Sequence, residues 1–78
     1  MERVTIPDIG DAEEIKLVEW NFEEGQDIKS GDELAVIETM KSLFSIEAPV
    51  SGVLEEIEIE AGRNVEKGQE IAQIKESR

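Results

Sequence analysis

The strongest constraint on the fold is an internal repeat with a spacing of 37 residues. Residues 16–38 laid over residues 53–75 give eight identical pairs, including two glycines that are six positions apart in each segment. A unit repeated in this way has one apolar face that it cannot bury alone. The two copies are therefore expected to close face to face around one core, with approximate two-fold symmetry. The identical pairs are Leu17 with Leu54, Glu19 with Glu56, Glu23 with Glu60, Gly25 with Gly62, Gly31 with Gly68, Glu33 with Glu70, Ala35 with Ala72 and Ile37 with Ile74.

The repeated segments have the periodicity of β-strands. In residues 18–23 (VEWNFE) and 55–60 (EEIEIE), most apolar residues alternate with polar ones. This period of two is typical of a strand with one buried face. Four other short segments have the same character: 3–6, 34–38, 43–47 and 71–75. In the first segment, Val18, Trp20 and Phe22 are expected to be buried, and Glu19, Asn21 and Glu23 are expected to face water.

Glycines separate these strands and indicate where the chain reverses. Glycine tolerates positive φ and tight reversals, so each is expected in a structural turn. Pro7 and Pro49 border strands rather than interrupt them. The sequence predicts an all-β fold, a small sandwich or flattened barrel. The expected turn glycines are Gly25, Gly31, Gly52, Gly62 and Gly68.

Composition excludes several classes of function. The 78 residues are expected to form one domain (1–78), and they contain neither cysteine nor histidine. This excludes disulfides, Cys/His zinc sites and nucleophile–histidine pairs, and a core without disulfides fits the cytoplasm. The net charge of −12 repels phosphate backbones, so nucleic acid is not an expected partner. No apolar run is long enough to cross a bilayer, so no membrane partner is expected.

One lysine stands out between two expected strands. Lys41 lies in the segment ETMKS, with LAVI before it and LFSIEAPV after it. The segment would form a hairpin that joins the two copies of the repeat. Because its tip lacks Gly, Asn and Pro, a type I turn is favoured over the primed types. Lys41 would project into solvent, away from the chain termini. The plainer interpretation is a solubilising surface lysine.

The motifs around Lys41 resemble the biotinyl/lipoyl attachment domain family over essentially the whole chain. GDELAVIETMKSLFSIEAPVSGVL looks like the central hairpin of that family, and EAGRNVEKGQEIAQI looks like its closing strands. The resemblance implies a flattened β-barrel of two four-stranded antiparallel sheets. It also implies that Lys41 is joined through an amide to biotin or lipoate. The domain would be a non-catalytic swinging-arm carrier, because the cofactor does the chemistry and the protein supplies position and reach.

The residues beside Lys41 match the biotinylation motif in part and the lipoylation motif in part. Biotinylated members typically have Met-Lys-Met, and Met40 matches the first position while Ser42 replaces the last. Lipoylated members typically have Glu-Thr-Asp-Lys-Ala, which Glu38, Thr39 and the small Ser42 fit. Because modification is decided at the ligase contact surface, Met40 favours biotin, with lipoate as the alternative. Met40 could also be a turn residue that packs on Leu43 or Phe44.

The resemblance also implies partners. A biotin protein ligase or a lipoate ligase would recognise Glu38, Thr39, Met40 and Ser42 around the lysine. The loaded domain, a monomer on its own, would serve a carboxylase and carboxyltransferase, or the components of a 2-oxo acid dehydrogenase complex. Whether it is free-standing or an excised module is left open.

The acidic loop 8–14 is a second candidate surface. In lipoyl-type relatives the equivalent loop lies near the lysine and helps partner enzymes recognise the domain, so Asp8, Asp11, Glu13 and Glu14 are candidate partner-recognition residues. The alternative is a solvated loop, and the spacing of these acids matches no EF-hand. A catalytic function is disfavoured because His, Cys and Tyr are absent. An unmodified adaptor that binds through its acidic face is a further alternative.

Overall fold

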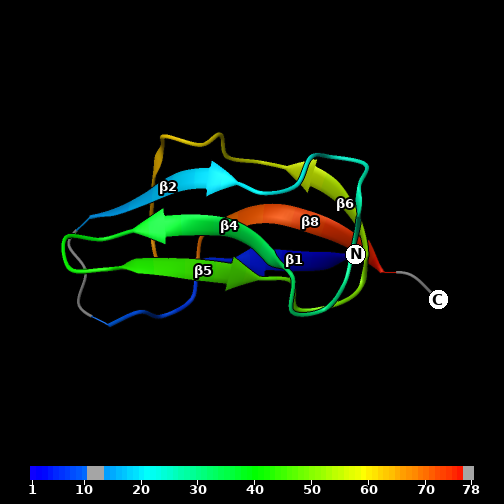
Figure 1. The fold of residues 1–78 in the computed structure, drawn as a ribbon, viewed down its shortest axis with the longest axis horizontal. Coiled ribbons are helices and arrows are strands. Elements are labelled where there is room, and N and C mark those ends of the chain that lie inside the picture. The colour runs from blue at the N-terminus through cyan, green and yellow to red at the C-terminus, as the bar shows by residue number, and fades with distance from the viewer. Residues whose placement is uncertain (11–13, 77–78) are drawn as a thin grey trace.

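The computed structural model describes residues 1–10 and 14–76 of the chain. These residues form eight β-strands arranged as two four-stranded antiparallel sheets, with strand orders β1-β8-β6-β3 and β5-β4-β2-β7 (Figure 1). Within the described part of the chain there is no helix that could span a membrane. The predicted all-β fold is confirmed. The strands are β1 (Glu2–Thr5), β2 (Ile15–Trp20), β3 (Asp27–Ile28), β4 (Glu33–Glu38), β5 (Leu43–Glu47), β6 (Gly52–Ile57), β7 (Asn64–Val65) and β8 (Glu70–Glu76).

The repeat in the sequence reappears as symmetry between the sheets. The 37-residue shift carries β2, β3 and β4 onto β6, β7 and β8, and β5 has the same place beside β4 as β1 has beside β8. The two short strands exchange sides: β3 pairs with β6, and β7 pairs with β2. Each copy of the repeat therefore completes the sheet of the other copy, and the expected approximate two-fold symmetry is confirmed.

The glycine corners connect the two copies in the same way on both sides. The N–H of Gly25 donates to the carbonyl of Leu54 over 2.8 Å, and the N–H of Gly62 donates to the carbonyl of Leu17 over 2.6 Å. Gly25 and Gly62 have φ of 92° and 95°, a region that disfavours side chains with a Cβ. Gly31 and Gly68, the second glycine of each corner, also have positive φ.

Gly52 is a different kind of glycine, and its prediction as a turn residue is wrong. It is the first residue of β6, where it pairs with Glu76 of β8 and with Ile28 of β3. Its φ is not in the positive region. A Cβ at this position would lie 2.1 Å from the carbonyl oxygen of Lys75, so close approach of two strands excludes a side chain.

The core lies between the sheets and is entirely apolar among the described residues. Equivalent positions of the repeat contribute equally: Leu17 and Leu54 are both fully buried, as are Ile37 and Ile74. A core of branched aliphatic side chains packed at high density gives a rigid body. The largest fully buried side chains are Ile6, Leu17, Leu34, Ile37, Leu54, Ile71 and Ile74.

A β-bulge in β2 changes the strand phase that the sequence suggested. The register between β2 and β4 shifts between Leu17 and Glu19, so Leu17 points inward and Val18 is 38% exposed. The prediction of a buried Val18 is therefore wrong. Beyond the bulge the predicted phase holds in part, because Trp20 and Phe22 are half-buried and pack against the core. Their neighbours Glu19, Asn21 and Glu23 are exposed, as predicted.

Candidate functional site

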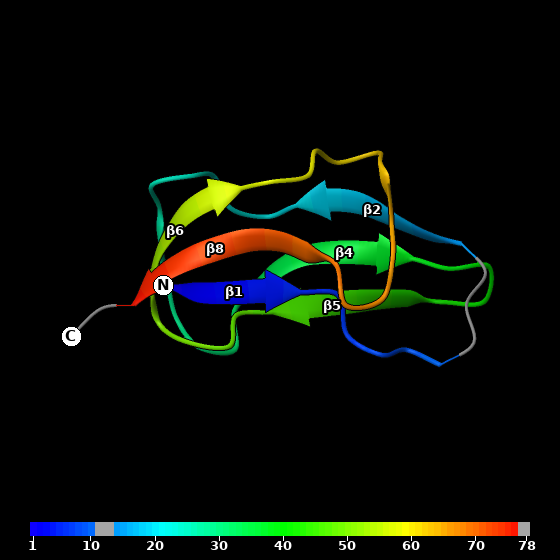
Figure 2. The same cartoon turned by 180° about the vertical axis from the view of Figure 1, so that it is seen from behind.

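Lys41 lies in the turn between β4 and β5, at one end of the elongated molecule. Figures 1 and 2 show this turn at the end opposite to the start of β1 and the end of β8. The turn follows Glu38 and precedes Leu43, which are paired residues of the two strands. Neither Met40 nor Lys41 has positive φ, which rules out the primed hairpin turns, as expected from the sequence. The tip is a continuation of a sheet that is anchored in the core.

Thr39 closes the turn with its backbone and its side chain. Its N–H donates to the carbonyl of Ser42 over 2.9 Å. Its hydroxyl oxygen accepts the N–H of Lys41 at 3.3 Å and the N–H of Ser42 at 3.2 Å, and the hydroxyl donates to the carbonyl of Ser42 at 3.3 Å. The short polar side chain thus makes the local hydrogen bonds to the backbone that Asn, Asp, Ser and Thr make at the start of other tight turns.

The side chain of Lys41 is exposed. Within residues 1–10 and 14–76, no ion pair involves its amine. Met40 is 89% exposed, and this contradicts the interpretation in which it packs on Leu43 or Phe44. Leu43, which was not predicted as a site residue, is 63% exposed just beyond the turn. The exposed amine therefore lies in a turn with two exposed apolar side chains, Met40 and Leu43, which do not pack in the core.

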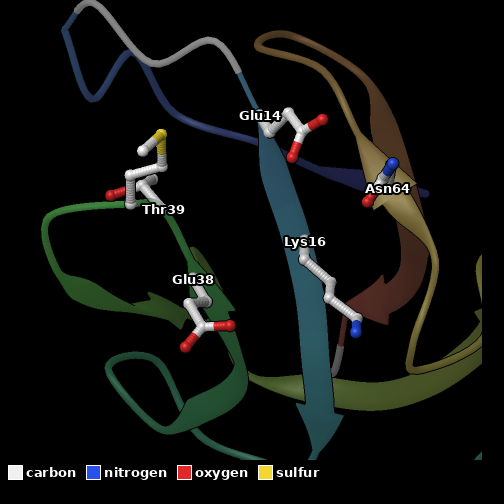
Figure 3. A pocket seen from close by; sticks show the side chains of 6 residues that line it. Glu14, Lys16, Glu38, Thr39 and Asn64 are labelled. Atoms are coloured by element: carbon white, nitrogen blue, oxygen red, sulfur yellow. The ribbon is translucent and has the colours of Figure 1, made fainter.

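A shallow groove of about 300 Å³ begins at the tip. It opens at the place where β2 and β4 part, since their pairing starts only at Lys16 and Glu38. Figure 3 shows Glu14 and Lys16 between the tip, with Glu38 and Thr39, and Asn64 of β7. Lys16 and Asn64 were not predicted as site residues, because nothing in their local sequence distinguishes them from other exposed strand positions. The lining residues are Glu14, Lys16, Glu38, Thr39, Met40 and Asn64.

The candidate partner-recognition residues of the loop are only partly described. Glu14 lines the groove beside the tip, whereas Asp11 and Glu13 lie outside the described residues. Asp8 is held at the start of the loop, where one carboxylate oxygen accepts the N–H of Gly10 at 3.0 Å and lies 3.7 Å from the amine of Lys67. The hydrogen bond from Gly10, and then the charge of Lys67, hold the pKa of Asp8 below its usual value of 3.8.

The acids of the other sheet form a separate cluster. Gln73 donates to the carboxylates of Glu58 and Glu70 over 2.9 Å and 3.1 Å, and Arg3 pairs with Glu70 at 3.2 Å. The hydrogen bond with Glu70 raises the pKa of Glu58 above its usual value. The cluster lies on strands β1 and β8 and just beyond β6, away from the sheet that carries Lys41.

Comparison with known proteins places the chain in a family. The family model described as "Biotin-requiring enzyme" matches residues 2–74. The chain belongs to the biotin/lipoyl attachment domain family, as the resemblance of its motifs implied. In that family it is a carrier domain.

Relatives of two kinds share this similarity. The chain is 37% identical over 70 residues to the dihydrolipoyllysine-residue acetyltransferase component of the pyruvate dehydrogenase complex of Staphylococcus aureus, covering 88% of the chain and 16% of that protein. It is 47% identical over 55 residues to the biotin carboxyl carrier protein of acetyl-CoA carboxylase of Pseudomonas aeruginosa, covering 69% of the chain and 35% of that protein. The chain thus spans only a minor part of either relative.

A solved structure confirms the fold. The lipoyl domain of the 2-oxoglutarate dehydrogenase complex of Azotobacter vinelandii superimposes with a TM-score of 0.82 at 22% identity, covering all of both chains.

Proposed function

We propose that the chain carries biotin on Lys41 and moves carboxyl groups between the active sites of a biotin-dependent carboxylase. The observation that carries the proposal is the exposed Met40–Lys41 pair at the tip of a rigid hairpin. The 47% identity to a biotin carboxyl carrier protein supports biotin, and so does the likeness of Met40–Lys41 to the first two residues of the biotinylation motif.

The exposed amine of Lys41 suits amide formation. Its nitrogen would attack the activated carboxyl carbon of the cofactor, which a ligase supplies, and the activating group and one proton would leave. The amide formed is neutral, and the long lysine stem becomes part of a flexible arm. Biotin, once bound, supplies the chemistry of carboxyl transfer.

The rigid body has a role in this function. An arm fixed to one point keeps its intermediate at an effective concentration set by the arm and linker lengths, so the intermediate does not diffuse away. That arrangement requires a base that does not move with the arm. The core of branched aliphatic side chains and the pairing of β4 with β5 up to Glu38 and Leu43 provide such a base.

The residues around Lys41 form the proposed ligase contact. Glu38, Met40 and Ser42 are exposed beside Lys41, and Thr39 is half-buried beneath them. We assign Asp8 and Glu14, together with Asp11 and Glu13 of the same loop, to recognition of the partner enzymes. The position of Glu14 in the groove beside Met40 supports this assignment. A monomeric carrier in the cytoplasm is part of the same proposal.

Lipoate on the same lysine is the second candidate. The similarity to a dihydrolipoyllysine-residue acetyltransferase component covers 88% of the chain, more than the 69% covered by the biotin carrier. Glu38, Thr39 and the small Ser42 also fit the lipoylation motif. In this case the domain would carry acyl groups in a 2-oxo acid dehydrogenase complex.

Intact mass spectrometry separates the two candidates. The chain is produced with biotin protein ligase in one culture and with lipoate ligase in another, each with its cofactor. We expect one biotinyl adduct in the first culture, lost in Lys41→Arg and retained in Lys16→Arg, a matched change at the nearby groove lysine. A lipoyl adduct alone would replace the first candidate with the second. No adduct with either ligase would overturn both.

A further inference from the structure

The five residues of the tip, 38–42, do not have equal access to a partner. Glu38, Met40, Lys41 and Ser42 are exposed, whereas Thr39 is half-buried. The hydroxyl of Thr39 is directed at the turn itself, where it bonds the N–H groups of Lys41 and Ser42 and the carbonyl of Ser42. A side chain engaged in this way has little to offer a ligase directly, but it acts on the backbone of the residue that is modified.

The hydroxyl replaces a bond that the backbone does not make. In a hydrogen-bonded β-turn, the fourth N–H usually donates to the carbonyl of the first residue. Here the N–H of Ser42 donates to the side chain of Thr39. The N–H of Lys41 uses the same oxygen, so one side-chain atom holds two consecutive amides of a turn that has no proline to limit its conformations.

We propose that Thr39 is a positioning residue for the loading of Lys41. The inference rests on the proposed function, because it concerns the same lysine and the same ligase. The hydroxyl fixes the backbone of Met40 and Lys41 before the ligase arrives, so the amine and the exposed thioether are presented together. Without it, the ligase has to order the tip during binding, and that ordering weakens association.

Two substitutions separate positioning from packing. Thr39→Val keeps the shape of the side chain and removes the hydroxyl, whereas Thr39→Ser keeps the hydroxyl. Kinetics of loading are measured with the ligase that modifies the unaltered chain. We expect Thr39→Val to raise KM for the carrier roughly fivefold with kcat nearly unchanged, because the defect precedes the chemical step. Thr39→Ser should restore KM to within about twofold.

A matched control and a second measurement keep the test specific. Thr5→Val makes the same change at an exposed position of β1 and should leave KM unaltered. The heteronuclear NOE of the Lys41 amide should fall in Thr39→Val only, while thermal unfolding stays that of the unaltered chain.

The outcomes are distinguishable. Loading of Thr39→Val with an unaltered KM, or a loss that Thr39→Ser does not rescue, overturns this inference and leaves the proposed function standing. Failure of the unaltered chain to be loaded by either ligase overturns both.

Discussion

The two ends of the molecule are built on the same plan and differ in what is added to it. At one end the N–H of Ile6 donates to the carbonyl of Gln69, and at the other the N–H of Ala48 donates to the carbonyl of Asp32, both in equivalent places. Beyond these bonds the ends diverge. The Lys41 end has a closed hairpin and a long connection between β1 and β2, whereas the opposite end has the start of β1, the end of β8 and a short connection from β5 to β6 (Figure 2). The segments that have no counterpart of equal length in the other half of the repeat therefore lie at the Lys41 end.

The grooves show which features follow from duplication alone. The opposite end also has a groove, of about 480 Å³, between β3 and β6. It is lined in part by Asp27, Ser51 and Val53, which the repeat superimposes on Asn64, Glu14 and Lys16 of the first groove. A hollow beside the end strands is therefore a property of the fold, and the hairpin tip with Lys41 is what distinguishes one end from the other.

The largest change in the free energy of unfolding is expected from substitutions of core residues at equivalent positions of the two copies. Leu17→Ala and Leu54→Ala should each lower the free energy of unfolding by about 3–5 kcal/mol, because both side chains are fully buried. The two losses should agree within about 1 kcal/mol if the halves share one core. Urea denaturation followed by Trp20 fluorescence measures them, and Leu→Val at the same positions is the milder pair. A loss at one position that is less than half of the other would break the equivalence.

The next largest change in the free energy of unfolding is expected at a position where the two copies of the repeat differ in structure. The repeat superimposes Gly52 on Ile15, yet Ile15 is a buried side chain and Gly52 has no room for one. Gly52→Ala should lower the free energy of unfolding by at least about 2 kcal/mol, since its Cβ would meet the backbone of β8. Ser51→Ala, one residue earlier, is the control and should cost less than about 1 kcal/mol. A Gly52→Ala variant as stable as the unaltered chain would show that β6 and β8 can separate there.

A smaller change in the free energy of unfolding is expected from side chains of the first copy that hydrogen-bond the backbone of the second copy. The indole N–H of Trp20 donates to the carbonyl of Ile59 over 2.8 Å. At Ile57, which the repeat superimposes on Trp20, the backbone N–H instead donates to the carboxylate of Glu24 over 2.7 Å. Trp20→Phe should lower the free energy of unfolding by about 1 kcal/mol, because the half-buried carbonyl loses its donor. Glu24→Gln, which keeps an acceptor oxygen, should be nearly neutral. Thermal unfolding followed by circular dichroism measures both, and no change in Trp20→Phe would indicate that water replaces the indole.

The smallest effect is the contribution of Asp8, at the Lys41 end, to the pH dependence of stability. The pKa of Asp8 is lowered in the folded protein, so the folded state binds fewer protons than the unfolded state. The resulting stability is fully present above the usual value of 3.8 and is lost as pH falls through the lowered pKa. Acid unfolding of Asp8→Asn should lack this contribution.

Titration of the Asp8 side chain by NMR tests the cause. Its pKa should lie below 3.8 in the unaltered chain and should rise part of the way in Lys67→Gln, because the larger contribution from the Gly10 N–H remains. At the opposite end, the repeat superimposes Ser30 on Lys67, and the N–H of Ser30 donates to the hydroxyl oxygen of Ser51. Because this pair carries no charge, Ser51→Ala should not alter the pH dependence. A pKa of Asp8 that does not respond to Lys67→Gln would contradict the charge contribution.

The sequence predicted much of the fold because the repeat limits the possible arrangements. Eight identities at one spacing led to two equivalent halves, and the paired glycines marked the corners that hold them together. The tip was predictable for the same reason, since a hairpin between two copies has to project from the body. The role of Gly52 was not predictable locally, because a turn glycine and a glycine at a close strand contact look alike in sequence.

The error in strand phase has a physical cause that the repeat itself contains. Simple alternation predicted an inward Val18, but the bulge leaves two consecutive residues on the outer side. The repeat superimposes Val18 on Glu55, which is followed by Glu56, and two adjacent acids after Leu54 already indicate a break in alternation. The alternation within one strand does not reveal where the bulge lies. Alignment of the two copies does, because both have the register shift directly after the equivalent residues Leu17 and Leu54.

The exchange of β3 and β7 has a consequence for biosynthesis. A nascent chain that has emerged only as far as β5 already contains Lys41. It lacks β7, which pairs with β2, and it lacks β6 and β8, the two central strands of the opposite sheet. Such a half cannot hold its hairpin steady. Under the proposed function, a ligase would therefore meet an ordered tip only after the second half of the domain has been synthesised, and attachment would follow completed folding.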